Sequence, residues 1–456
     1  DGYGMHEQLI DKALEDRIDT ILTCDNGIAA AKEIEYGKAL GMTIIVTDHH
    51  EVPYKENEAG RRYILPPADA VVDPRPEGCE YPFKGLCGAA VAYKLIEALS
   101  EVNGQDVADL DYLLENVAIA TVADVMDLTE ENRILVKQGL EMLTRTSNLG
   151  LRALIQCIGL EGKKIQAYHI GFILAPCLNA SGKLDTAKRA LALLRAKTER
   201  EADMLAGDLK ALNESRRDMT DRVVDEAMAK VEQTDIREDK VLVIYLPDCH
   251  ESLAGLVAGR VRENYYRPVF VLTDSEDGVK GSGRSIESYS MYEELTGCGD
   301  LLTKFGGHPM AAGLSLDKEN VEKFKRRLND QCTLSEEELT EKVVIDMELP
   351  FTAITEHFIE ELECLEPFGK GNAKPVFAAR GVIMQHVKII GKNKNVAKAT
   401  AIDASGNRME AICFRDAQEF AEQCERNNGK MSITFYPGIN EFRGERQIQI
   451  VITHYR

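Results

Sequence analysis

Two short segments near the start of the chain place acidic and imidazole side chains directly after apolar runs. Residues 23–27 (Thr-Cys-Asp-Asn-Gly) follow the first run, and residues 47–51 (Thr-Asp-His-His-Glu) follow the second. Carboxylate and imidazole groups together suit Mn²⁺ or Mg²⁺, and histidine shifts the preference toward manganese. A lone Asp at a strand end is more often the N-cap of the next helix. An Asp-His-His triplet at the end of one strand and another Asp at the end of the neighbouring strand favour a metal site.

The elements around these segments predict how the side chains are positioned. Apolar runs at residues 18–24 and 42–47 predict strands, and residues 28–40 between them have helical spacing. This order predicts a right-handed βαβ unit in a parallel sheet. Ligands of such sheets bind beyond the carboxyl ends of the strands. The polar residues expected to meet at that edge are Asp25, Asp48, His49 and His50.

The rest of the chain predicts three further regions. Residues 185–233 contain one Gly and no Pro and are rich in Ala, Leu, Glu, Lys and Arg, which predicts a long connecting helix. A second α/β domain follows it. After about residue 343, short β-rich runs between Gly and Asn turns predict a small closed barrel. The predicted class is therefore α/β with a C-terminal β-barrel, divided at residues 1–184, 185–233, 234–335 and 340–456.

Charge and composition restrict the function classes. The net charge of −21 does not by itself indicate a nucleic-acid binder, but residues 370–456 contain 14 Lys and Arg against 8 Asp and Glu. Local charge decides what a groove attracts. No apolar run of eighteen residues and no signal-peptide pattern is present, so neither a membrane span nor a membrane partner is expected. Eleven cysteines without a Cys-x-x-Cys pair fit a reducing cytoplasm, which is the expected location.

Two glycine-rich segments of the second α/β domain have phosphate-binding chemistry. Residues 281–285 (Gly-Ser-Gly-Arg-Ser) are expected to expose backbone N–H groups beside a guanidinium. Residues 304–313 place His308 in a second glycine-rich loop. Either segment alone is more often an ordinary turn.

The Asp-His-His triplet resembles the one that names the DHH phosphoesterase family. Asp73 stands where relatives often have Asn. The second α/β domain resembles the family's DHHA1 domain, and the last domain, introduced by residues 365–372, resembles the OB-fold of RecJ-type exonucleases. The motifs of the first domain that carry the resemblance occur in family order at residues 23–28, 46–51, 81–88, 120–125 and 178–184.

The resemblance implies a role for each matching residue. Asp25, His49 and Asp124 are implied ligands of two Mn²⁺ or Mg²⁺ ions, while His50 faces the scissile phosphate and Asp48 orients the histidine pair. The implied phosphate-binding residues are Arg284, Ser285, Gly306, Gly307 and His308. An OB-fold groove binds single strands with basic and aromatic side chains. The nucleic-acid-binding candidates, each more often a solvated surface residue, are Asn179, Lys392, Lys394, Arg443 and Arg446.

The implied reaction is metal-dependent 5′-to-3′ hydrolysis of single-stranded DNA in DNA repair and recombination. The implied protein partners are a single-stranded-DNA-binding protein or a RecQ-type helicase. One alternative is a DHH phosphodiesterase of short oligonucleotides or cyclic dinucleotides, which the OB-fold disfavours. The other is a non-catalytic scaffold that binds single-stranded DNA. The family has an Asp-x-Asp motif on its first strand and none precedes Asp25 here, so we expect these 456 residues alone to have little nuclease activity.

Overall fold

The chain divides into two compact units in the computed structural model. The first unit contains Asp1–Pro176, Leu194–Asp203 and Val344–Arg456, and the second contains Cys177–Leu193 and Met204–Val343. No helix among the described residues combines the length and the apolar character that a membrane span needs. The structure describes residues 4–57, 60–184, 187–391, 394–414, 416–442 and 444–456.

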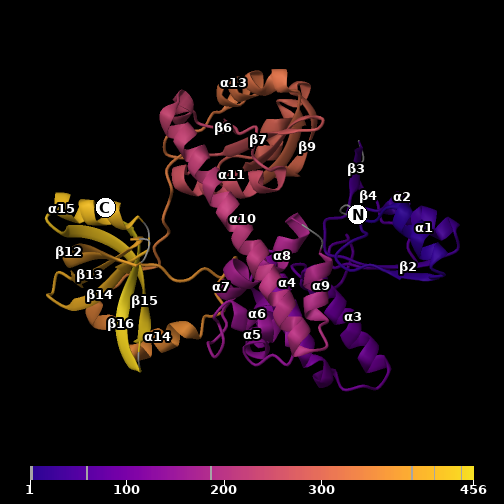
Figure 1. Ribbon diagram of the computed structural model, residues 1–456, viewed down its shortest axis with the longest axis horizontal. Helices are drawn as coiled ribbons and strands as arrows, with labels where there is room; N and C mark the ends of the chain where they lie inside the picture. The colour runs from indigo at the N-terminus through magenta and orange to yellow at the C-terminus, as the bar shows by residue number, and fades with distance from the viewer. Residues whose placement is uncertain (1–3, 58–59, 185–186, 392–393, 415, 443) are drawn as a thin grey trace. The chain divides into compact units, whose positions relative to one another are not determined.

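The first unit begins with the predicted parallel sheet (Figure 1). Its strands lie in the order β1 (Thr20–Leu22), β2 (Thr43–Thr47) and β5 (Ala70–Val72). Helix α2 (Ala31–Ala39) joins β1 to β2 and completes the predicted βαβ unit. It covers the sheet because its buried Ile34 packs into the apolar core that the strands provide.

The remainder of the N-terminal region is helical apart from one hairpin. Strands β3 (Tyr54–Asn57) and β4 (Gly60–Tyr63) pair antiparallel shortly after the Asp-His-His triplet. The helices, in chain order, are α1 (Glu7–Glu15), α3 (Gly88–Val102), η1 (Val107–Leu113), α4 (Leu114–Ala123), α5 (Glu130–Thr144), α6 (Leu149–Cys157), α7 (Ala167–His169), η2 (Ile170–Leu174) and α8 (Ala175–Leu184).

The long connecting helix is shorter than predicted. The structure has a separate helix α9 (Lys188–Leu194), and the long helix α10 is confined to Glu199–Gln233. The cause is local: the hydroxyl of Thr198 accepts the N–H of Glu201 (3.2 Å), and the Glu201 carboxylate accepts the N–H of Lys197 (3.1 Å). Such a reciprocal cap starts a helix at this point. The Thr-x-x-Glu spacing was a signal in the sequence that composition alone did not reveal.

The second unit contains a five-stranded mixed sheet. Its strand order is β6-β7-β8-β10-β9, in which only β6 and β7 are parallel. The strands are β6 (Leu242–Tyr245), β7 (Val269–Ser275), β8 (Gly278–Arg284), β9 (Leu302–His308) and β10 (Ala311–Leu316). The helices are η3 (Asp235–Glu238), α11 (Glu251–Tyr265), α12 (Met291–Thr296), η4 (Gly299–Leu301), η5 (Lys318–Asn320) and α13 (Val321–Gln331).

The first glycine-rich segment of this unit lies mostly in a strand, and the second forms a hairpin in which a turn at residues 309–310 joins β9 to β10, so the prediction that His308 lies in a loop was wrong. The first forms most of β8, whose two edges pair with β7 and β10. The backbone N–H groups of this segment therefore lie within a ladder. Glycine is needed because a Cβ at Gly281 would lie 2.4 Å from the Leu272 side chain, and one at Gly283 would lie 2.5 Å from Met291 Sδ.

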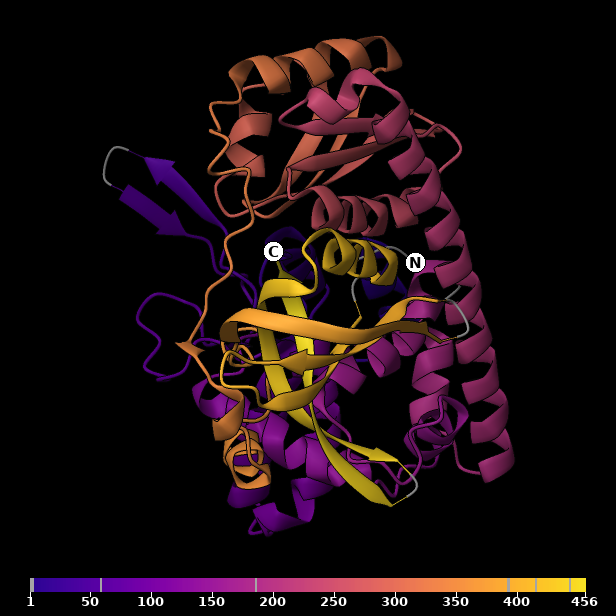
Figure 2. The ribbon, with the colours of Figure 1, turned by 90° about the vertical axis from the view of Figure 1, so that its left-hand side faces the viewer.

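The C-terminal region is the predicted closed barrel (Figure 2). Five strands lie in the order β12-β13-β14-β16-β15, and β15 pairs again with β12 to close the sheet. The first barrel strand is β12 (Phe377–Ile390), and the short strand β11 (Met347–Glu348) precedes it in the chain. Three helices accompany the barrel: η6 (Phe351–Ala353), α14 (Glu356–Glu363) and α15 (Ala417–Arg426). The other strands are β13 (Val396–Ile402), β14 (Arg408–Cys413), β15 (Lys430–Phe442) and β16 (Glu445–Tyr455).

Candidate metal centre

The polar residues that follow the first two strands lie at one edge of the sheet. Leu22 of β1 pairs with Ile45 of β2, so Asp25 and Asp48 each lie three residues beyond a paired position. The N–H of Asp25 donates to the carbonyl oxygen of Thr47 (3.0 Å), which keeps the two segments side by side beyond the strands.

Asp25 is held in an unusual backbone conformation. Its φ is +60°, which non-glycine residues rarely adopt. Gly88, the first residue of α3, leaves the space that Asp25 occupies. A Cβ on Gly88 would lie 2.4 Å from Asp25 Cβ and 2.7 Å from Asp25 Cα. The close approach of α3 thus confines Asp25, whose carboxylate remains about half exposed.

Asp48 is almost fully buried and acts as a hydrogen-bond acceptor for its surroundings. One carboxylate oxygen accepts the N–H of Ile28 (2.9 Å), and the other accepts the N–H of His49 (2.8 Å) and lies 2.7 Å from His50 Nδ1. Burial alone would raise the pKa of Asp48, but the hydrogen bonds from Ile28, His50 and His49 lower it. An ionised Asp48 favours a proton on His50 Nδ1, which leaves Nε2 for other contacts.

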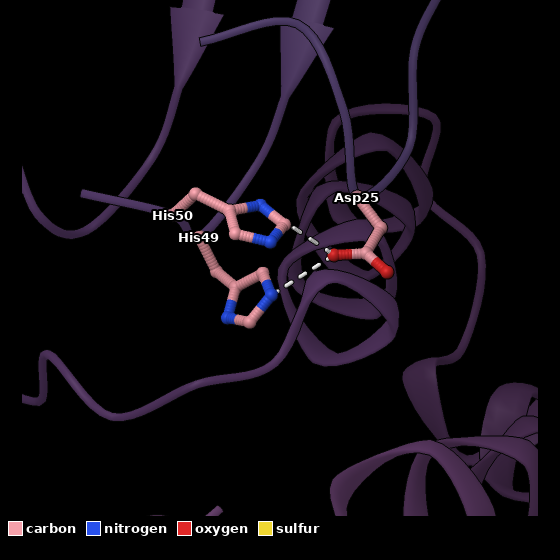
Figure 3. A group of neighbouring side chains, drawn as sticks. All are labelled: Asp25, His49 and His50. Carbon is pink, nitrogen blue, oxygen red and sulfur yellow. Dashed lines mark ion pairs between the residues drawn. The ribbon is translucent and has the colours of Figure 1, made fainter. Parts of the chain in front are cut away.

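His49 lies between two carboxylates that come from different elements. Its Nε2 is 2.9 Å from Asp25 Oδ1 and 3.5 Å from Asp124 Oδ2, while His50 Nδ1 is 3.9 Å from the same Asp25 oxygen (Figure 3). The contact with Asp25 raises the pKa of His49 against the opposing effect of burial. The ligand atoms of Asp25, His49 and His50 all lie within 4.8 Å of one another.

This donor set fits a divalent metal ion. His49 is 6% exposed, and neither of its ring nitrogens has a hydrogen-bond partner of acceptable geometry among the described residues. Buried polar atoms without a partner are uncommon in native proteins and indicate a ligand. Imidazole with carboxylates is a set that Mn²⁺ accepts, and carboxylates alone suit Mg²⁺.

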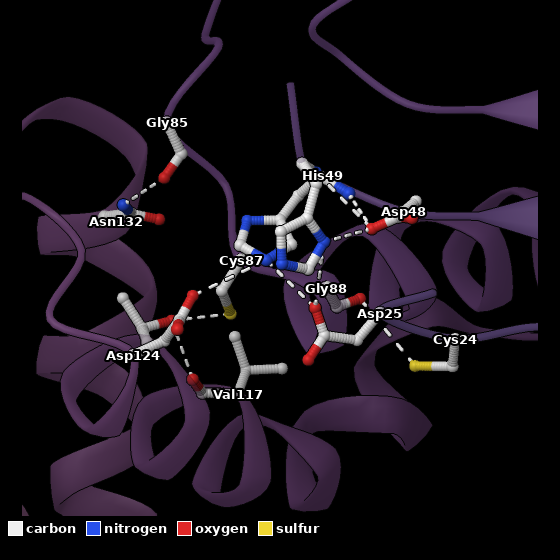
Figure 4. Close-up of polar contacts among 12 residues, drawn as sticks. Cys24, Asp25, Asp48, His49, Gly85, Cys87, Gly88, Val117, Asp124 and Asn132 are labelled. Atoms are coloured by element: carbon white, nitrogen blue, oxygen red, sulfur yellow. Dashed lines mark hydrogen bonds and ion pairs between the residues drawn. The ribbon is translucent and has the colours of Figure 1, made fainter. Parts of the chain in front are cut away.

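Asp124 reaches the group from the end of α4. It is the C-terminal cap of this helix, and its carboxylate lies beside His49 (Figure 4). In the preceding turn the hydroxyl of Thr121 donates to Val117 O (2.7 Å) and lies 3.3 Å from Cys87 Sγ. Burial raises the pKa of Asp124, and the nearby His49 acts in the opposite direction. The five residues predicted at this site, Asp25, Asp48, His49, His50 and Asp124, are therefore neighbours in the structure.

A lysine from the C-terminal region also lies beside this site. Lys370 Nζ is 3.2 Å from Asp127 Oδ1, its carbonyl oxygen accepts the N–H of Leu128 (2.7 Å), and its charge acts to lower the pKa of Asp124. Sequence reasoning missed Lys370, because the segment 365–372 indicated only the approach to the barrel. Its neighbour Glu366 is also attached to the first domain, since its carbonyl oxygen accepts a bond from Arg133 (3.1 Å).

Asp73, at the end of β5, is a further buried carboxylate near the group. One oxygen accepts the N–H of Arg75 (2.8 Å), and the other has no partner among the described residues. Burial, assisted by the charge of Asp48, raises the pKa of Asp73 to about 6.

The predicted phosphate-binding residues lie on the sheet of the second unit. Arg284 ends β8, where its Nη1 donates to Gly283 O (2.8 Å), and burial lowers its pKa. His308 ends β9 and is exposed. A cavity of about 580 Å³ opens over this sheet, and its lining includes Gly306 and also Lys280 and Lys304, which the sequence did not single out.

Other candidates of this unit have different surroundings. The Ser285 hydroxyl is buried and donates to Tyr289 O (2.6 Å), and Gly307 packs so closely on β10 that a Cβ would lie 2.4 Å from Ala311 O. His250 caps α11 by accepting the N–H of Ser252 (3.2 Å).

The candidates for nucleic-acid binding have separate positions. Asn179 is exposed on α8, and Lys394 is exposed before β13. Arg446 is exposed but forms an ion pair with Glu356 (3.2 Å). The two others lie outside the described residues: Lys392 and Arg443.

Comparison with known families finds three matches along the chain. The DHH family N-terminal domain matches residues 3–121, the DHHA1 domain matches residues 238–334, and the RecJ OB domain matches residues 345–454. These matches follow the predicted order of domains.

Curated proteins and solved structures give the same result. "Single-stranded-DNA-specific exonuclease RecJ" of Bacillus subtilis is 36% identical over 99% of the chain, which spans 56% of that relative. The proteins of the same name from Salmonella typhimurium and Escherichia coli are 33% and 32% identical, and the chain spans 80% of each. The crystal structure of RecJ in complex with Mn²⁺ from Thermus thermophilus matches with a TM-score of 0.80 and 27% identity, covering 99% of this chain and 63% of that one.

Proposed function

We propose a function that proceeds from one premise: the chain belongs to the RecJ family of DHH exonucleases. Within that family, we infer that it contributes the catalytic core of a metal-dependent hydrolase that removes nucleotides from the 5′ end of single-stranded DNA. Its setting is DNA repair and recombination, where a single-stranded-DNA-binding protein or a RecQ-type helicase presents the strand.

The observation that carries this proposal is the position of His49. This nearly buried imidazole has two carboxylates within ion-pair distance of Nε2, and its Nδ1 has no hydrogen-bond partner among the described residues. We propose Asp25, His49 and Asp124 as metal ligands. A bound Mn²⁺ or Mg²⁺ would supply Lewis-acid stabilisation of the phosphate and lower the pKa of water. The crystal structures of Thermus RecJ in complex with Mn²⁺ and with Mg²⁺ support the choice of metal.

His50 is the proposed group that meets the phosphate. Asp48 accepts a hydrogen bond at His50 Nδ1, which fixes the ring and directs Nε2 away from Asp48. The other ring nitrogen of His50 is then free to meet a phosphate oxygen where negative charge develops. Arg284 and His308 are the proposed contacts to further phosphates, since a guanidinium and an imidazole both donate to such oxygens.

The test is hydrolysis of 5′-phosphorylated single-stranded DNA in the presence of Mn²⁺, with a duplex of the same sequence as the control. The substrate would be given to this chain and to a version that includes any residues its gene encodes upstream. Release of nucleotides from the single strand, and its loss in His49→Ala, is the expected result. Binding of the strand by the longer version without any release would favour the scaffold alternative instead.

A further inference from the structure

The first unit contains a second cavity, separate from the metal centre, where its helices meet the C-terminal region. The cavity measures about 730 Å³ and lies among α5, α7, the segment 363–374 and the barrel. Four aromatic side chains contribute to its lining: Tyr168, Phe368, Phe414 and Tyr436. Burial raises the pKa of Tyr436, which lines the cavity together with Tyr168.

The walls of this cavity are tied together by polar contacts on its rim. Glu366 forms an ion pair with Lys164 (2.9 Å) and accepts a hydrogen bond from Gln166 (3.2 Å), and all three residues line the cavity. The carbonyl oxygen of Glu366 also accepts a bond from Arg133. The cavity therefore has a defined shape, set by contacts that join the helical region to the segment before the barrel.

Two of the four lining rings, those of Tyr168 and Phe414, are exposed. Tyr168 stacks on Phe172 with ring centroids 4.9 Å apart and an interplanar angle of 27°, although the two residues are 59% and 72% exposed. Phe414 is 61% exposed. Exposed flat rings in such a group lack the burial that normally accounts for aromatic residues, and unpaired nucleobases stack on such surfaces whatever their sequence.

Cationic groups accompany these rings. Lys374 Nζ lies 3.9 Å from the ring centroid of Tyr436 and 5.8 Å from that of Phe368. Lys137 also lines the cavity, as do Glu141, Glu363 and Glu366. The charges of Glu366 and Glu363 act on Lys374, but neither carboxylate is within ion-pair distance of it among the described residues. Aromatic faces for bases beside ammonium groups for phosphates are the combination that single-strand sites use.

The cavity is also connected to the metal centre by one short stretch of chain. Lys370 contacts Asp127 beside Asp124, and Lys374 lines the cavity four residues later. Four residues span no more than about 14 Å. A strand with its end at the metal centre thus reaches the cavity within a few nucleotides.

We propose that this aromatic cavity holds an unpaired nucleobase of the substrate strand, at a fixed number of nucleotides from the end that is cut. This inference rests on the proposed function and adds a base-binding site to it. The site recognises the π-face and not the identity of the base. It selects single strands because a base in a duplex is not free to enter.

The test measures binding of the whole chain to 5′-phosphorylated oligothymidylate by fluorescence anisotropy, with a chelator present to prevent hydrolysis. A series of oligonucleotides carries one abasic nucleotide at successive positions. One position is expected to weaken binding roughly tenfold when its base is removed. In Tyr168→Ala this sensitivity should disappear, and Tyr168→Phe should retain it because stacking does not require the hydroxyl.

Tyr112→Ala is the matched control, since Tyr112 is also 59% exposed and lies elsewhere in the same unit. An unchanged abasic profile in Tyr168→Ala, with normal affinity for the intact strand, would overturn the base site and leave the proposed function intact. No binding of single strands by the unmodified chain would instead overturn the proposed function.

Discussion

Arg284 and His308 lie in one row of the five-stranded sheet of the second unit, on either side of Ala311. Ala311 of β10 pairs with Arg284 of β8 and with His308 of β9. Residues paired across neighbouring strands point to the same face, and two strand spacings separate them by roughly 9–10 Å. The sheet thus presents two donors on one face at a spacing that suits different oxygens of a polyanion.

Replacement of Arg284 by Ala should weaken binding of single-stranded DNA by about 1.5–3 kcal/mol, because a charge-assisted hydrogen bond to phosphate is lost. Affinity is measured by anisotropy, and turnover is measured under the same conditions. Arg326→Ala, an exposed arginine on α13, is the control. If affinity and turnover are both unchanged, Arg284 does not contact substrate.

The two histidines of the triplet should separate metal binding from turnover. His49→Ala is expected to lower Mn²⁺ affinity by about tenfold or more, since even residues that only support metal ligands have effects of this size. His50→Ala should retain most of the affinity and still lose turnover. Calorimetric titration with Mn²⁺ gives the first quantity, and the nuclease assay gives the second. Equal loss of Mn²⁺ affinity in both variants would make His50 a ligand.

Asp73→Asn should stabilise the metal-free protein in a pH-dependent way. The pKa of the Asp73 carboxyl is 3.8 in the unfolded chain and about 6 in the folded protein. The neutral form therefore stabilises the folded protein at low pH, and this stabilisation declines as the pH rises to 6. Above pH 7 we expect the variant to be about 1–3 kcal/mol more stable, since one pKa unit corresponds to about 1.4 kcal/mol. Thermal melting with a chelator at pH 4 and pH 7.5 tests this, and an equal difference at both values would contradict it.

The salt dependence of binding should distinguish two basic residues of the barrel. Each phosphate contact contributes about −0.7 to the slope of log affinity against log salt on single strands. Lys394 forms no ion pair within the described part of the chain, so Lys394→Gln should reduce the slope by about that amount. Arg446 is already paired with Glu356, and Arg446→Gln should change the slope less. An unchanged slope in both variants would place the salt-sensitive contacts elsewhere.

These 456 residues should bind a single Mn²⁺ and have low nuclease activity. A two-metal site needs enough anionic ligands to clamp both the attacking and the leaving oxygen. The carboxylates that meet His49 in the structure are Asp25 and Asp124. Native mass spectrometry gives the number of ions, and turnover is compared with the version that includes any upstream residues. Two bound ions, or equal turnover of both versions, would refute this expectation.

The metal centre was predictable because strand ends determine which residues meet. The run that became β2 was assigned to within one residue, and pairing of Leu22 with Ile45 then brings Asp25 next to Asp48. Lys370 was not predictable in this way. Its position depends on how a distant segment packs on the end of α4, and no local pattern encodes such a contact.

The glycine-rich strands in the sheet of the second unit show a different limit of prediction from sequence. Strands are predicted from side chains that alternate between two faces, and glycine has none to alternate. In β8 the missing side chains are the reason for the structure, because Gly281 and Gly283 leave space for Leu272 and Met291. The same absence removes the pattern by which the strand is recognised.

Gly88 gives the metal centre a steric control point that carries no charge. A methyl group at this position would collide with the Cα and Cβ atoms of Asp25, neither of which can rotate away, so helix α3 or the ligand loop would have to move. Gly88→Ala is therefore a means of disabling the centre while every ionisable group remains in the sequence. Such a variant would serve as an inactive enzyme whose site keeps its native charge, so that binding of DNA can be studied without a change in electrostatics.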